Sequence, residues 1–96
     1  DPKPGVITGA QAKALVAKGA KLFDVRTPGE FKGTEVPGAV NIPLKDLGER
    51  MDEFGDKSAP VIVYCHSGRR SAIALKQLER AGYTQVYDMG PRTAWK

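Results

Sequence analysis

The chain alternates between short apolar runs and longer segments in which apolar residues recur at helical spacing. The short runs are typical of buried strands and cover residues 6–7, 21–25, 38–43, 61–64 and 85–88. Helical spacing covers residues 9–18, 44–54 and 69–81. Pro28 predicts one further helical turn, which contains Glu30 and Phe31. Strands and helices are therefore expected to alternate along the chain.

Local signals mark the ends of the helices. Thr8, followed three residues later by Gln11, forms a capping box that predicts the start of the first helix. Gly19 and Gly82 predict the ends of the first and last helices, because glycine commonly follows a helix C-terminus. The apolar residues that share one face of segment 44–54 are interpreted as core and not as a cofactor-binding box; they are Leu44, Leu47, Met51 and Phe54.

This alternation predicts an α/β fold in a single domain, residues 1–96, with a small, mainly parallel sheet flanked by helices on both faces. In sheets of this kind, ligands bind outside the carboxyl ends of the strands. Asp24, Arg26 and Cys65 all lie at predicted strand ends. We therefore expect their side chains to border one crevice.

Composition narrows the classes of function. The 96 residues suffice for one core, and no apolar run is long enough to span a membrane. A net charge of +4 suits a small anionic substrate. Nucleic-acid binding is not expected, because the only adjacent basic pair, Arg69-Arg70, lies inside a candidate reactive loop.

The single cysteine and single histidine exclude an internal disulfide and disfavour a closed zinc site, so we expect no metal. A lone cysteine fits a reducing cytosol and an exported protein equally well. The chain begins with Asp1 instead of methionine, and the polar segment 1–5 resembles a mature N-terminus after signal removal. This start favours an exported, for example periplasmic, protein over a cytoplasmic one.

The candidate chemistry centres on Cys65, which follows the apolar run 61–64. An unpaired cysteine is often a small buried hydrophobe, so this alternative must be weighed. The polar residues after Cys65 favour a reactive thiol instead, since a core rarely contains such neighbours; they are His66, Ser67, Gly68, Arg69, Arg70 and Ser71. The predicted helix 69–81 places a positive helix end and two arginines beside the sulfur, which favours the thiolate.

Two groups of residues form motifs with defined spacing. The first comprises Asp24-Val25-Arg26, Glu30-Phe31 and the segment 36–43. The second comprises Cys65, Gly68, Arg70 and Ser71. Together they resemble the signatures of the rhodanese family of sulfurtransferases over nearly the whole chain. Further matches are Gly82-Tyr83, Val86-Tyr87, Gly90 and Trp95, although Trp95 is interpreted as core.

The chain also departs from the family pattern at two places. Thr34-Glu35 stands where the family often has Gly-His, and Gly90-Pro91 stands where it often has two glycines. Neither departure touches the cysteine loop, but both are expected to alter the rim of the site.

The resemblance implies a sulfurtransferase that needs no cofactor. The Cys65 thiolate would take the outer sulfur of thiosulfate, or of a similar small anionic donor, and hold it as a persulfide. Cyanide, a thiol or a protein acceptor would then remove the sulfur. The amides of residues 66–71 would point at the sulfur and stabilise its charge, and Gly68 would allow the tight curl of the loop.

The surrounding residues are given supporting roles, of which only that of Arg70 follows from a match to the family pattern. Arg70 is expected to brace the loop through a charge pair with Glu30, although an ordinary surface pair is the alternative. Arg69 is assigned to anion attraction, and His66 to the rim of the pocket instead of to general-base catalysis. Ser67 and Ser71 would bond to the sulfur or cap the helix. Asp24 and Arg26 would orient the loop from the neighbouring strand end.

Alternative functions remain open at this stage. Phosphatases and arsenate reductases of the same fold also curl a loop around a thiolate, but they carry one residue more between cysteine and arginine than the four found here. A persulfide carrier or protein-binding module would need the same loop without small-molecule turnover. A thiol redox sensor would lack a resolving cysteine in this chain.

Overall fold

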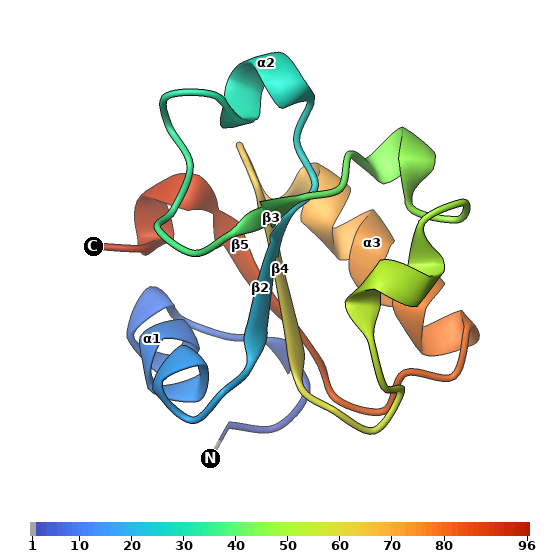
Figure 1. Cartoon of the computed structure of the whole chain (residues 1–96). Coiled ribbons are helices and arrows are strands. Elements are labelled where there is room, and N and C mark those ends of the chain that lie inside the picture. Colours follow the sequence, from blue (N-terminus) through green and yellow to red (C-terminus); the bar gives the residue numbers. More distant parts are fainter. Residues whose placement is uncertain (1) are drawn as a thin grey trace.

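A five-stranded parallel sheet forms the centre of the computed structural model, which describes residues 2–96 (Figure 1). The strand order is β1-β5-β4-β2-β3, and every neighbouring pair runs parallel. The strands are β1 (Gly5–Val6), β2 (Lys21–Asp24), β3 (Val40–Asn41), β4 (Val61–Cys65) and β5 (Val86–Pro91). Asp1, the first residue of the predicted processed N-terminus, lies outside the described residues.

The helices are α1 (Gly9–Ala17), α2 (Pro28–Phe31) and α3 (Arg69–Arg80). Three short 3-10 segments complete the fold, namely η1 (Leu44–Asp46), η2 (Met51–Phe54) and η3 (Arg92–Ala94). Figure 1 shows α1 and α3 on opposite sides of the sheet, with α2 beyond the carboxyl ends of the strands. The predicted α/β fold is therefore confirmed. None of the described helices has the length and apolar character that a membrane span requires.

The central strand β4 contributes side chains to the hydrophobic cores on both faces of the sheet. Successive strand residues point to opposite faces. Val61, Val63 and Cys65 accordingly belong to the core cluster beneath α3, whereas Ile62 and Tyr64 belong to the cluster beneath α1. All five side chains are buried, which accounts for the continuous apolar run in the sequence.

The prediction of one helix over 44–54 is wrong. The segment forms η1 and η2 separately, although its apolar residues pack on the α3 side of the sheet as core, with Leu47 and Phe54 fully buried. Gly48 lies between the two segments and disfavours a continuous helix by about 1 kcal/mol relative to alanine. Burial of Leu47 and Phe54 thus fixes the segment without requiring regular helical hydrogen bonds.

Several predicted boundaries also shift. The first strand covers residues 5–6 instead of 6–7, and the third is shorter than 38–43. Strand β4 extends through Cys65, and β5 extends to Pro91, next to Cys65 in the sheet. The predicted capping box is confirmed, because the Thr8 hydroxyl accepts from the Gln11 amide at 3.1 Å and the Gln11 side chain accepts from the Thr8 amide at 2.9 Å.

Candidate active site

The Cys65 sulfur lies at the carboxyl end of β4, against the start of α3. The backbone N–H of Gly68 donates to Cys65 Sγ at 2.9 Å. The Cys65 thiol in turn donates to the Ser71 hydroxyl at 3.6 Å, and that hydroxyl donates to the Gly68 carbonyl at 3.1 Å. Strand end, loop and first helical turn therefore converge on one sulfur atom.

The conformation of Gly68 makes this arrangement possible. Gly68 is the N-cap of α3 and has φ +92°, a left-handed value that favours glycine over other residues. This conformation reverses the chain after Ser67 and turns the Gly68 amide back toward the sulfur. The positive end of the 12-residue helix α3 then begins immediately beyond it.

The surroundings of Cys65 correct two expectations. Cys65 is the last residue of β4, not a residue beyond it, and its exposed fraction is 0% because its side chain points into the α3-side core. In the described part of the chain, Gly68 is also the only residue of 66–71 whose amide donates to the sulfur. The sulfur thus accepts from one amide and lies at the positive helix end, and it is not surrounded by a full ring of amide donors.

Arg70 and Glu30 form a bidentate ion pair beside the loop. Arg70 Nη1 lies 2.6 Å from Glu30 Oε1, and Arg70 Nη2 lies 2.9 Å from Glu30 Oε2. Hydrogen bonds from the Arg70 guanidinium, and then from the Thr27 amide, lower the pKa of Glu30 from 4.5 to about 2. The pair joins α2 to the first turn of α3, across 40 residues of sequence.

Glu30 is held in place for this contact by its own helix. The Thr27 hydroxyl accepts from the Glu30 amide at 3.3 Å, and Glu30 Oε1 accepts from the Thr27 amide at 3.0 Å. These bonds form a capping box at the start of α2, which the Thr-x-x-Glu spacing could have indicated. One carboxylate therefore caps α2 and pairs with Arg70.

Asp24 and Arg26 pair with each other, and no hydrogen bond or ion pair among residues 2–96 joins either side chain to the cysteine loop. Arg26 Nη2 lies 2.7 Å from Asp24 Oδ2, and both residues are buried. Arg26 also donates to Thr34, from Nη1 to the hydroxyl at 3.1 Å and from Nη2 to the carbonyl at 3.2 Å. The Arg26 guanidinium lies over the ring of Tyr64, on the face of β4 opposite Cys65. The pair therefore orients the segment around Thr34.

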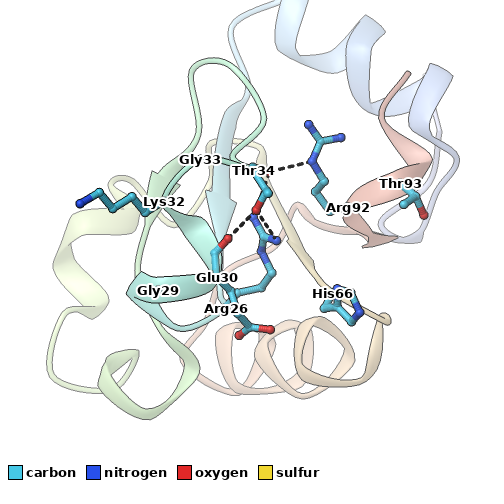
Figure 2. A pocket seen from close by; sticks show the side chains of 9 residues that line it. All are labelled: Arg26, Gly29, Glu30, Lys32, Gly33, Thr34, His66, Arg92 and Thr93. Carbon is cyan, nitrogen blue, oxygen red and sulfur yellow. Dashed lines mark hydrogen bonds between the residues drawn. The ribbon is translucent and has the colours of Figure 1, made fainter.

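The remaining predicted site residues lie around the mouth of the loop. His66, Ser67 and Arg69 are exposed, and no hydrogen bond among residues 2–96 joins any of them to the sulfur. His66 lines a cavity of about 660 Å³ next to the loop (Figure 2). The other residues that line it are Arg26, Gly29, Glu30, Lys32, Gly33, Thr34, Arg92 and Thr93.

The cavity contains residues that the sequence analysis did not select. Arg92 is the most informative of these, because its Nε donates to the Thr34 carbonyl at 2.7 Å across 58 residues of sequence (Figure 2). Thr34 was noted only as a departure from the family pattern. No local signal marks either residue as part of a site, since the contact depends on how the loop after α2 meets η3 in the fold.

Comparison with known proteins identifies the chain. The family model of the rhodanese-like domain matches residues 8–96. The chain belongs to the rhodanese family. It is 44% identical over 90 residues to thiosulfate sulfurtransferase PspE of Escherichia coli, an alignment that covers 92% of this chain and 86% of that protein. This similarity places the chain among sulfurtransferases.

Two further comparisons describe the extent of the similarity. The chain is 41% identical over 70 residues to uncharacterized protein YqhL of Bacillus subtilis, covering 73% of this chain and 55% of that protein. The human single-domain sulfurtransferase TSTD1 has the same fold, with a TM-score of 0.84 at 24% identity, covering 99% of this chain and 96% of the other. The rhodanese fold therefore extends over essentially the whole chain.

The two departures from the rhodanese pattern both lie close to the site. Thr34 lines the cavity, and Glu35 Oε2 accepts from the Gly33 amide at 2.8 Å. Pro91 is the sheet neighbour of Cys65, and Gly90 has φ +80°. Trp95, in contrast, packs half-buried against the α1-side core of this rhodanese, with Lys13 Nζ 5.3 Å from its ring centre.

Proposed function

We propose that this rhodanese is a thiosulfate sulfurtransferase that carries the transferred sulfur as a persulfide on Cys65. The observation that carries the proposal is the 2.9 Å hydrogen bond from the Gly68 amide to Cys65 Sγ at the start of α3. A donor aimed at the sulfur stabilises a thiolate before transfer and a persulfide anion after it. The name of the relative PspE, thiosulfate sulfurtransferase, supports thiosulfate as the donor.

The first half-reaction loads the protein. The Cys65 thiolate attacks the outer sulfur of thiosulfate, the sulfur–sulfur bond of the donor breaks, and sulfite leaves with the bonding electron pair. Cys65 then carries one additional sulfur as a persulfide anion. Because Cys65 is buried, the donor approaches with its terminal sulfur first. The Gly68 amide donates to the sulfur and, with the positive end of α3, is positioned to stabilise its charge, whereas the Ser71 hydroxyl donates to the Gly68 carbonyl.

The second half-reaction unloads the protein. Cyanide attacks the outer sulfur of the persulfide, thiocyanate forms, and the electron pair of the broken bond returns to Cys65 as the thiolate. A thiol acceptor reacts in the same way and leaves as a persulfide. No external oxidant or reductant is consumed in either half-reaction, which is covalent catalysis of the ping-pong kind.

The ion pair between Glu30 and Arg70 keeps the loop in this conformation. Arg70 lies in the first turn of α3, directly after the loop, and its bidentate contact fixes that turn against α2. We therefore treat Glu30 and Arg70 as positioning residues, since neither is hydrogen-bonded to the sulfur in the described part of the chain.

The proposal is tested by intact-mass measurement. The reduced protein and its Cys65→Ser variant are incubated with thiosulfate, and their intact masses are measured. Cyanide is then added and the thiocyanate formed is assayed. We expect the wild type to gain one sulfur atom and to lose it as thiocyanate, and the variant to gain none. No mass gain in the wild type would refute thiosulfate as donor. Loading without repeated turnover on cyanide would instead support a persulfide carrier.

A further inference from the structure

Asp88 is a buried carboxylate that the proposed mechanism does not use. Its exposed fraction is 3%, and it lies on β5 opposite Val63 of β4. Residues opposite each other in neighbouring strands point to the same face, so Asp88 lies on the α3 side of the sheet, as Val63 and Cys65 do. In the part of the chain that the structure describes, no ion pair involves Asp88. Its burial therefore depends on a hydrogen-bond partner.

That partner is the backbone two residues further along the chain. The Gly90 N–H donates to Asp88 Oδ1 at 2.7 Å, which closes an Asx turn. The turn coincides with a break in the register of the sheet. Val63 pairs with Asp88, but the next residue of β4, Tyr64, pairs with Gly90. Met89 is therefore an extra residue in β5, and the Asp88 side chain closes a β-bulge at this point.

The bulge lies against the cysteine loop. A β-carbon added to Gly68 would lie 3.5 Å from Gly90 Cα and 3.8 Å from Pro91 Cδ. The shifted register also places Pro91 opposite Cys65 in the sheet. Gly68 in turn donates its N–H to Cys65 Sγ at 2.9 Å. A continuous series of contacts thus leads from Asp88 through Gly90 and Gly68 to the sulfur.

We propose that Asp88 is a positioning residue for sulfur transfer, which holds the β5 bulge against Gly68 and so keeps the Gly68 amide directed at Cys65 Sγ. This inference rests on the proposed function. Asp88 acts through the backbone, because its side chain bonds to the Gly90 amide and not to the sulfur.

The proposed role depends on an acceptor oxygen at position 88 and not on its charge. Asparagine offers the same acceptor oxygen without the charge, serine offers a weaker acceptor, and alanine offers none. A direct effect of the charge would have the opposite sign, because removal of a negative charge near the sulfur favours the thiolate. The two explanations therefore predict different orders of reactivity among the variants.

The test measures the rate of persulfide formation by intact mass after rapid mixing with increasing concentrations of thiosulfate. The variants are Asp88→Asn, Asp88→Ser and Asp88→Ala. Tyr83→Phe is the control, because it also removes a buried side-chain hydrogen bond to the backbone, from the Tyr83 hydroxyl to the Gly55 carbonyl at 2.8 Å. Tyr83 follows the end of α3 that is distant from the cysteine loop. Urea titration establishes the conditions under which each variant is folded.

We expect Asp88→Ala to form the persulfide about tenfold more slowly at saturating thiosulfate, since the amide donor is displaced and not deleted. The half-saturating thiosulfate concentration should not change, because Asp88 does not contact the donor. Asp88→Asn and Tyr83→Phe should load at the wild-type rate. Asp88→Ser should lie between Asp88→Asn and Asp88→Ala, and it provides the measurement if Asp88→Ala does not fold.

A double variant tests whether the effect passes through Gly68. Asp88→Ala and Gly68→Ala displace the same amide, so together they should slow loading by clearly less than the product of the two single effects. The proposal would be overturned by wild-type loading in Asp88→Ala, by equal losses in Asp88→Asn or Tyr83→Phe, or by the full product in the double variant. Failure of the wild type to load with thiosulfate would instead overturn the proposed function, so the two failures are distinguishable.

Discussion

Replacing Gly68 by alanine should impair sulfur transfer more than it impairs folding. Gly68 has φ +92°, and a residue with a side chain loses about 1 to 2 kcal/mol in the left-handed region. The added β-carbon would lie 3.5 Å from Gly90 Cα, an ordinary contact, so no steric cost is added. The chain can relieve the strain by rotating φ, but rotation moves the Gly68 amide away from the sulfur.

The kinetic consequence follows from the 2.9 Å bond between that amide and Cys65 Sγ. Complete removal of one donor to a developing anion costs about a hundredfold to a thousandfold in rate. Because relaxation displaces the amide without deleting it, we expect Gly68→Ala to form the persulfide about tenfold to a hundredfold more slowly. The rate is measured by intact mass after rapid mixing with thiosulfate, and the free energy of unfolding by urea titration.

Gly19→Ala provides a matched control. Gly19 has φ +103° and open space around its missing β-carbon, and it follows α1, away from the cysteine loop. Both substitutions should lower the free energy of unfolding by about 1 to 2 kcal/mol. Only Gly68→Ala should slow persulfide formation. If both variants load at the wild-type rate, the Gly68 amide does not stabilise the sulfur and the assigned role is refuted.

Two further predictions concern the ion pair and the docking of α1. Glu30→Gln should slow persulfide formation while Glu53→Gln, which breaks an equally close ion pair at 2.6 Å in η2, should not. Because the pKa of Glu30 is lowered from 4.5 to about 2 on folding, its pair contributes fully to stability above pH 4.5 and progressively less toward pH 2. The difference in urea midpoint between wild type and Glu30→Gln should therefore shrink as the pH falls; a constant difference would contradict this account. Gly9→Ala should lower the free energy of unfolding by about 1 to 3 kcal/mol, because the added β-carbon would overlap the Ala94 carbonyl oxygen. The control Gly48→Ala should change the free energy of unfolding by less than about 0.5 kcal/mol, because no atom lies within 4 Å of the position of its β-carbon. Equal unfolding midpoints for these two glycine variants would exclude the close approach of α1 to η3.

Features that depend on neighbouring residues were predictable from the sequence. The capping box at Thr8 was predicted because its two hydrogen bonds join residues only three positions apart. The strand at 61–64 was predicted because burial on both faces requires a continuous apolar run. The prediction of one helix over 44–54 was wrong because the spacing of apolar residues indicates only which side of a segment is buried. It does not determine which hydrogen bonds the backbone forms.

The placement of charged side chains was less predictable. Asp24 and Arg26 lie at the expected strand end, but the sequence pattern did not show that Arg26 lies over Tyr64, on the face away from Cys65. Alternation along β4 decides this, because consecutive residues point to opposite faces. The same alternation buries the Cys65 side chain in the core while keeping its sulfur at the start of α3.

The alternating α/β order and the glycine at the curl of the loop could be inferred from the amino-acid sequence alone. These follow from periodicity and turn chemistry, which act over a few residues. Folding is required to bring Glu30 to Arg70 and Arg92 to Thr34, and to form the cavity between these segments. The contacts join residues 40 and 58 positions apart, and such contacts exist only after strand order has brought the carboxyl ends of the sheet together.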